Sequence, residues 1–269
     1  MGHLQARIVS YLCLSSLIGL TIGLIVSLAA NVFVNGIKYF EALRLTLLTR
    51  FSFIETSEYI IPFAWLTVGF VFVFLIKKIV GCTSWQGPAD AIYCAHRPDK
   101  DMDIRQGFGT VLAAFTSLSA GASLGQYGPI VHMGALIGGF FKKYNLTSIN
   151  LSNDIFLGCG VAAAISAGFQ APIAGVIFAH EAILRHFSVR AIAPIAISSI
   201  CAASISEWLS LSENILALDF DPEPLIKQVP ALLIGGLIFS LIAVFLMKST
   251  LNGIAAVNRL KLPLHYLGF

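Results

Sequence analysis

The run Gly125-Gln126-Tyr127-Gly128-Pro129 places two glycines and a proline at the expected start of an apolar helix. The first backbone N–H groups of a helix have no partner inside it, and together they carry roughly half a positive charge. Because glycine lets an ion approach the backbone closely, such a start can bind an anion without a lysine. The candidate anion-binding residues here are Gly125, Gln126, Tyr127 and Gly128.

The same glycines have a structural alternative. The spacings Gly121-x-x-x-Gly125 and Gly134-x-x-x-Gly138 are typical of close packing between membrane helices. From the residues alone, an anion site and a packing surface are equally supported.

A second helix start follows the run Ser84-Trp85-Gln86-Gly87-Pro88, ahead of a short predicted helix over residues 87–95. The Ser84 hydroxyl could donate to an anion, whereas Asp90 in the first turn would cap the helix and compete with it. Transporters hold anions at mid-membrane depth by pointing helix starts at them. Ser84 is therefore a further candidate ligand.

Enzyme and metal chemistry are poorly supported. The run Gly121-Ala122-Ser123-Leu124-Gly125 fits the Gly-x-Ser-x-Gly elbow of serine hydrolases, but that elbow needs a preceding strand. An intramembrane serine hydrolase using His132, His180 or His186 is the least favoured alternative. The histidines lack the His-Glu-x-x-His zinc spacing, and the five cysteines form no Cys-x-x-Cys pair. We expect no enzyme, no metal site and no cofactor.

The elements that must position these residues belong to a membrane protein. Hydrophobic residues make up 57% of the chain and charged residues 12%, about half the charged fraction of a soluble domain. The net charge of +3 without a long basic run gives no reason to expect nucleic acid as a partner. Long apolar segments predict spans at residues 8–34 and 59–80 and, more weakly, at 108–123, 191–206 and 229–247.

Other apolar segments are broken by glycine and proline, at residues 87–95, 128–141, 156–169 and 171–184. Inside lipid, a helix can be interrupted only where the freed backbone is buried in protein or lines a cavity. We expect Pro88, Pro129, Pro172 and Pro194 in the first turns of helices. An all-α, polytopic protein with half-crossing helices is therefore expected, and such helices indicate a pathway.

Basic residues suggest an orientation, and an acidic loop suggests a boundary. Arg7 and the pair Lys77-Lys78 mark the cytoplasmic side, which leaves residues 35–58 as an external loop. The acidic, proline-containing segment 213–223 separates a first part, residues 1–212, from residues 213–269.

Two motifs resemble the CLC family of chloride channels and proton/chloride antiporters. Gly125-Gln126-Tyr127-Gly128-Pro129 is similar to the family's Gly-Lys/Arg-Glu-Gly-Pro, and Val131, Gly134, Ile137 and Gly138 follow at the family's spacing. The second motif reads Ala-Gly-Phe-Gln-Ala-Pro-Ile-Ala-Gly-Val-Ile-Phe over residues 167–178, where the family has Ala-x-Phe-Asn-Ala-Pro-Leu-Ala-Gly-x-x-Phe, and Glu181 follows it. The family's Gly-Ser-Gly-Ile-Pro signature is only loosely matched by residues 84–88.

The resemblance implies the first of two inverted repeats over residues 1–212. Residues 213–269 would then be the connecting loop and an incomplete start of the second repeat. It also implies a multi-pass protein, in a bacterial inner membrane, that moves chloride or another small anion. The family's homodimer would use contacts from residues 171–184 and 191–206. In the family, the other half of the anion site comes from the second repeat.

Two departures from the family change the expected mechanism. The gating glutamate falls on Tyr127, and the internal proton-transfer glutamate falls on Ala182, beside the structural acid Glu181. An ordinary phenol has a pKa near 10, so it cannot alternate with a charged form near neutral pH as a carboxylate does. Tyr127 could instead donate its O–H to an anion, plug the pathway or simply pack.

We therefore expect anion transport that is channel-like or uncoupled from protons. The alternative is a structural or regulatory membrane subunit that does not transport. Glu181 and Arg185 are four residues apart, and we expect a structural ion pair between them on one helix face.

Overall fold

A computed structural model describes residues 2–50, 57–82, 84–97, 100–143, 151–209 and 225–259 of the protein. Helices and their connections account for all of these residues, which confirms the all-α prediction. The chain divides into two compact units, Met1–Glu213 and Asn214–Phe269. Within the described ranges, four helical segments are long and apolar enough to cross a membrane: Ser10–Arg50, Ile60–Val80, Val189–Trp208 and Lys227–Gly253.

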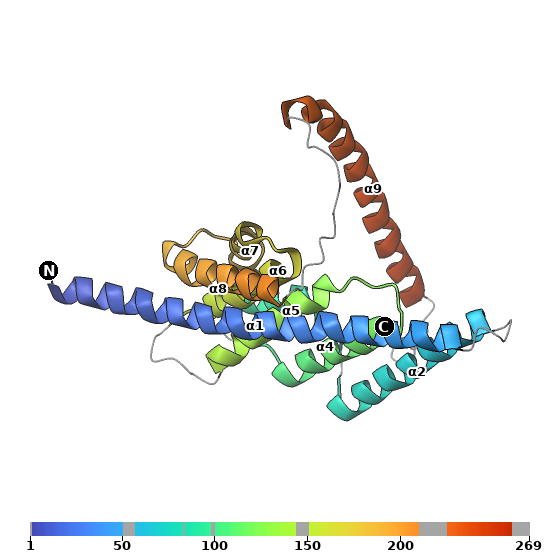
Figure 1. Cartoon of the computed structure of the whole chain (residues 1–269). Coiled ribbons are helices and arrows are strands. Elements are labelled where there is room, and N and C mark those ends of the chain that lie inside the picture. The colour runs from blue at the N-terminus through green and yellow to red at the C-terminus, as the bar shows by residue number, and fades with distance from the viewer. Residues whose placement is uncertain are drawn as a thin grey trace. The chain divides into compact units, whose positions relative to one another are not determined.

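The first unit contains all the elements that carry the candidate site (Figure 1). They are α1 (Gly2–Arg50), α2 (Ser57–Val80), α3 (Pro88–Ala95), α4 (Ile104–Ser119), α5 (Tyr127–Lys143), α6 (Asn153–Phe169), α7 (Pro172–Phe178), the π-helical turn η1 (Ala179–Leu184) and α8 (Val189–Trp208). The second unit contributes α9 (Leu225–Arg259), whose apolar side chains are exposed along most of its length.

The first helix is longer than expected. We predicted an external loop over residues 35–58, but α1 continues without a break to Arg50, so that prediction is wrong for residues 35–50. The extension contains good helix formers, among them Glu41, Ala42 and Leu43, and no proline to stop it. Residues 51–56 of the predicted loop lie outside the described ranges.

Glycines set the distance between α5 and α6. A Cβ atom on Gly134 would overlap the backbone oxygen of Gly160, and one on Gly138 would overlap that of Phe156. Gly160 in turn faces the backbone oxygen of Gly134. For the Gly134-x-x-x-Gly138 pair, close packing is therefore the role that the structure supports. The helix α6 is buried over most of its length. The glycine contact holds it directly against α5, the helix whose start is the candidate anion site.

A similar contact joins α1 to α8, which lie side by side in Figure 1. Cβ atoms on Gly19 and Gly23 would overlap the backbone oxygens of Pro194 and Ser198. The Ser27 hydroxyl donates to the Ala202 carbonyl at 3.1 Å. The close approach of two backbones fixes one edge of the bundle.

Three of the four prolines begin helices as predicted. Pro88 and Pro172 are the first residues of α3 and α7, and Pro129 lies in the first turn of α5. Pro194 does not, because α8 already starts at Val189, and that prediction is wrong. The Ser188 carbonyl accepts from the amides of Ala191 and Ile192, which starts the helix one turn earlier than the proline.

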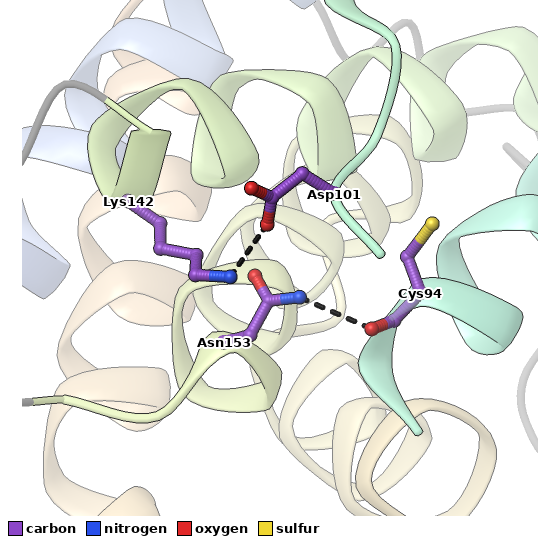
Figure 2. A network of polar contacts seen from close by, with 4 residues as sticks. All are labelled: Cys94, Asp101, Lys142 and Asn153. Carbon is purple, nitrogen blue, oxygen red and sulfur yellow. Dashed lines mark hydrogen bonds and ion pairs between the residues drawn. The ribbon is translucent and has the colours of Figure 1, made fainter. Parts of the chain in front are cut away.

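Polar contacts tie the far end of α5 to neighbouring segments (Figure 2). The Lys142 ammonium donates to the Asp101 carboxylate at 2.5 Å, which joins the end of α5 to the segment before α4. The Asn153 amide donates to the Cys94 carbonyl at 3.1 Å, which joins the start of α6 to the end of α3. One bond therefore ties α5 to the segment that leads into α4, and the other ties α6 to α3.

Candidate anion-binding site

The starts of α3 and α5 meet at one pocket. Its volume is about 130 Å³. The start of α5 contributes Gly128 and Pro129, and His132 follows one turn later. The other lining residues are Gln86, Gly87 and Pro88 at the start of α3, and Thr110, Val111 and Ala114 of α4. The two proline-containing starts singled out in the sequence are therefore neighbours in space.

The start of α3 is already capped. The Gly87 amide donates to the Asp90 carboxylate at 2.7 Å, and the Gln86 amide donates to the Thr110 hydroxyl at 3.1 Å. Pro88 has no N–H to offer. An anion at this end would have to displace Asp90, a carboxylate from the same helix. Ser84 is exposed and is not one of the residues that line the pocket.

The start of α5 is open. A Cβ atom on Gly125 or on Gly128 would meet no heavy atom of the described chain within 4 Å. Close packing therefore does not explain these two glycines, and the space beside their backbone is free for a ligand. Gln126 is half-buried, and its carbonyl accepts from the Ile130 amide at 3.3 Å. Gly121 differs from both, because its φ of +92° and the adjacent Arg44 guanidinium account for a glycine there.

Tyr127 turns towards the end of α6. Its half-buried ring stacks on Phe169, with ring centroids 4.0 Å apart and planes 24° apart. Gly168 lies under the same ring, where a Cβ atom would come within 3.1 Å of Tyr127 Cδ1. Tyr127 is not among the residues that line the pocket. Of the three roles considered for Tyr127, the structure contains the packed ring. A role for its hydroxyl in binding an anion stays a prediction.

The structure does not form the expected pair of Glu181 and Arg185. Glu181 lies in η1, a π-helical turn that ends at Leu184. Arg185 follows with a φ of +56°, outside the helix. Both side chains are exposed, and the described residues include no ion pair between them, so that prediction is wrong. Ala182 is half-buried in the same turn.

Sequence reasoning missed His132 as part of this site. Its side chain is 1% exposed and lines the pocket, and neither ring nitrogen has a hydrogen-bond partner in the described chain. The buried Oε1 of Gln86 also lacks a partner there. The signal was present in the spacing, because His132 follows Gly128 by four residues and so lies on the same helix face. From the sequence, His132 is a candidate only as one of three histidines available to a serine hydrolase.

The hydrolase alternative gains no structural support. Ser123 is exposed in the connection between α4 and α5, and the element before it is the helix α4. The strand that a nucleophile elbow requires is therefore replaced by a helix. Among the described residues there is also no cluster of three or more His, Cys, Asp or Glu that could hold a metal ion.

Comparison with known proteins points to one family. The family described as voltage gated chloride channel matches residues 68–268. A putative chloride channel protein ClcB-like of Ralstonia nicotianae is 27% identical over 107 residues, which are 39% of this chain and 25% of that protein. Chloride channel protein CLC-c of Arabidopsis thaliana is 31% identical over 164 residues, which are 50% of this chain and 21% of that protein.

Two solved structures share the fold. A slow cyanobacterial Cl⁻/H⁺ antiporter has a TM-score of 0.80 at 20% identity, covering 94% of this chain and 60% of the antiporter chain. A CLC-type fluoride/proton antiporter has a TM-score of 0.65 at 24% identity, covering 84% of this chain and 54% of that chain. This chain thus spans a quarter or less of the two curated relatives and little more than half of these structures.

Proposed function

The chain belongs to the voltage-gated chloride channel (CLC) family, and from that premise we propose that it moves chloride or another small anion across a membrane. The open start of α5 carries the proposal. Gly125 and Gly128 leave free space beside the first amides of a helix, where an anion is stabilised by unpaired N–H groups and by the helix dipole. The candidate ligands remain the backbone of Gly125, Gln126, Tyr127 and Gly128.

We further propose that this transport is uncoupled from protons. At the position of the gating glutamate, Tyr127 is stacked on Phe169, and Ala182 stands at the internal proton-transfer position. A phenol and a methyl group both lack the carboxylate that would take up and release a proton at these two positions. The two antiporters that share the fold are described as exchanging anions for protons, so this chain would differ from them.

For the assembly we propose a homodimer in a bacterial inner membrane. The segments expected at the dimer contact, residues 171–184 and 191–206, carry large apolar side chains on the surface. Ile173 is 76% exposed, and Ile177 and Ile200 are also exposed. Ser84 also remains a proposed anion ligand. To act as one, its hydroxyl would have to turn towards the pocket.

Chloride efflux from liposomes containing the full chain tests the proposed transport. We expect efflux that requires a shunt for electrical charge and carries no protons. A Gly128→Val variant should lower the efflux rate about tenfold or more, because the added side chain fills the open space beside the α5 start. Gly236→Val is the matched control, since a Cβ atom on Gly236 in α9 also meets nothing within 4 Å.

Three outcomes would contradict parts of this proposal. Stoichiometric proton counter-movement would overturn the uncoupled mechanism. Equal efflux from Gly128→Val and Gly236→Val would remove the α5 start from the pathway. No efflux above protein-free liposomes would favour the alternative, a structural or regulatory subunit that does not transport.

A further inference from the structure

The pocket between α3 and α5 contains polar groups that lack partners. His132 is 1% exposed, and both of its ring nitrogens are without a hydrogen bond in the described chain, as is the Oε1 of Gln86. Leaving a buried polar group unpaired is costly in free energy. The pocket volume of about 130 Å³ exceeds the roughly 10–15 Å³ that a cavity needs to hold one water. A polar ligand therefore fits this space and would satisfy these groups.

The groups around His132 determine which ligand fits. From the start of α3, the Gly87 backbone and the Asp90 carboxylate both interact with the ring. Asp90 also caps the Gly87 amide, and no described ion pair joins it to His132. From α4, the lining residues Thr110, Val111 and Ala114 do not titrate. Behind α5, the helix α6 presents Phe156, Gly160 and Ala164. A protonated His132 would thus be buried without a close counter-ion.

We propose that this pocket binds a small anion and a proton together, with His132 as the group that takes the proton. This inference rests on the proposed anion transport and adds a pH-dependent site to it. The proton comes from solution and stays on the imidazole, so the anion and the ring neutralise each other. A protonated ring has two N–H donors: the anion can accept from one of them, and the backbone of Gly87, which interacts with the ring, can accept from the other.

The proposal has a definite thermodynamic consequence. A buried charge is costly unless it is paired, so the anion favours protonation of His132 and the protonated ring favours the anion. By linkage, each ligand raises the affinity for the other by the same factor. The proton binds to His132 when the anion occupies the site and is released when the anion leaves, and it is not carried across the membrane. The site therefore makes anion occupancy depend on pH without coupling anion movement to proton movement.

Calorimetric titration of the full chain with potassium chloride tests the proposal. Measurements at about pH 5.5 and about pH 8 lie on either side of the ordinary histidine pKa near 6.5. We expect chloride to bind at least about tenfold more weakly at the higher pH, where each bound anion must bring a proton. Titration at the higher pH in two buffers of different ionisation enthalpy should show about one proton taken up per chloride.

Two substitutions make the test specific. His132→Gln keeps a neutral side chain of similar size and should abolish both the pH dependence and the proton uptake. His180→Gln is the matched control, because His180 is also 1% exposed with one unpartnered nitrogen, but it stacks on Phe187 and does not line the pocket. We expect His180→Gln to bind chloride with the pH dependence of the unaltered chain.

A spectroscopic measurement covers the case in which His132→Gln fails to fold. In the unaltered chain, NMR resonances of the histidine ring nitrogens should show that chloride increases the protonated fraction of one histidine. The absence of that change, or equal pH dependence in the unaltered chain and His132→Gln, would overturn the proposal. Chloride efflux combined with pH-independent binding and no proton uptake would overturn it and leave the proposed transport intact. The absence of both binding and efflux at either pH would overturn both.

Discussion

At the scale of single residues, Tyr127 is the residue that we propose stands at the gate of the pathway. Its ring is held from two sides, by stacking on Phe169 and by contact with Gly168. Stacked aromatic pairs contribute about 0.5–1.5 kcal/mol beyond the area they bury. A side chain packed in this way is held in place, whereas a gating carboxylate must move and change its charge.

Restoring a carboxylate should therefore restore sensitivity to protons. We expect Tyr127→Glu to make chloride efflux slower as the pH rises, because the ionised carboxylate competes with the anion at the α5 start and protonation removes that competition. Efflux from liposomes across a pH series measures the effect. Tyr127→Phe is the control that keeps the stacked ring, and its efflux should stay within about twofold of the unaltered chain. A flat pH profile for Tyr127→Glu would contradict the assignment of position 127 to the gate.

At the scale of elements, the same residue type serves two purposes on α5. Gly134 and Gly138 allow α6 to approach until the two backbones touch, whereas Gly125 and Gly128 face open space. The first pair builds a rigid support, and the second pair leaves the helix start accessible. The α5–α6 contact therefore positions the candidate site, although none of the residues that form it line the pocket.

A single methyl group tests the α5–α6 contact. Replacing glycine by alanine inside a helix normally stabilises it by about 1 kcal/mol. Gly160→Ala should nevertheless destabilise the protein, by about 1–3 kcal/mol, because its Cβ would overlap the backbone of Gly134 and the helices must move apart. Thermal unfolding in detergent should show a lower Tm.

The matched control for this prediction is Gly236→Ala, where the added Cβ meets no atom within 4 Å. We expect its Tm to equal or exceed that of the unaltered chain. If Gly160→Ala were as stable as Gly236→Ala, the α5–α6 contact would be looser than the structure describes.

At the scale of the whole molecule, apolar surface is distributed over several helices. A membrane protein exposes such surface to lipid, so exposure alone does not identify a contact between subunits. We choose the face formed by α7 and α8 as the candidate dimer contact, because the family resemblance places that contact at residues 171–184 and 191–206. Ile173 and Ile177 lie four residues apart on that face.

A charge on this face should separate the subunits. We expect Ile173→Glu to shift the protein from dimer to monomer in analytical ultracentrifugation in detergent, because a buried carboxylate without a partner opposes association. Phe63→Glu on α2 is the matched control, since Phe63 is 74% exposed and Ile173 is 76% exposed. If both variants remained dimeric, the α7–α8 face would not be the contact, and a monomeric unaltered chain would exclude the dimer itself.

Local sequence was sufficient for the class of fold and for several helix starts. The apolar composition and the uncharged spans predicted a helical membrane protein, because transfer into lipid depends on residue type and segment length. Pro88 and Pro172 marked the starts of α3 and α7, because a proline ring fixes its own φ angle and needs no amide partner in a first turn. Pro194 did not mark a helix start, because hydrogen bonds to the Ser188 carbonyl begin α8 before the proline.

The site itself depended on neighbours that are distant in the sequence. Gly128 and Gly134 are the same residue type on one helix, and only the position of α6 separates an open helix start from a packing contact. Likewise, only the fold places Tyr127 against Phe169 and brings His132 beside the start of α3. The sequence by itself determined that several segments are apolar enough to enter a membrane and where many helices can begin, because those properties follow from adjacent residues. Tertiary structure decided which polar groups share a pocket, because that depends on contacts between separate helices.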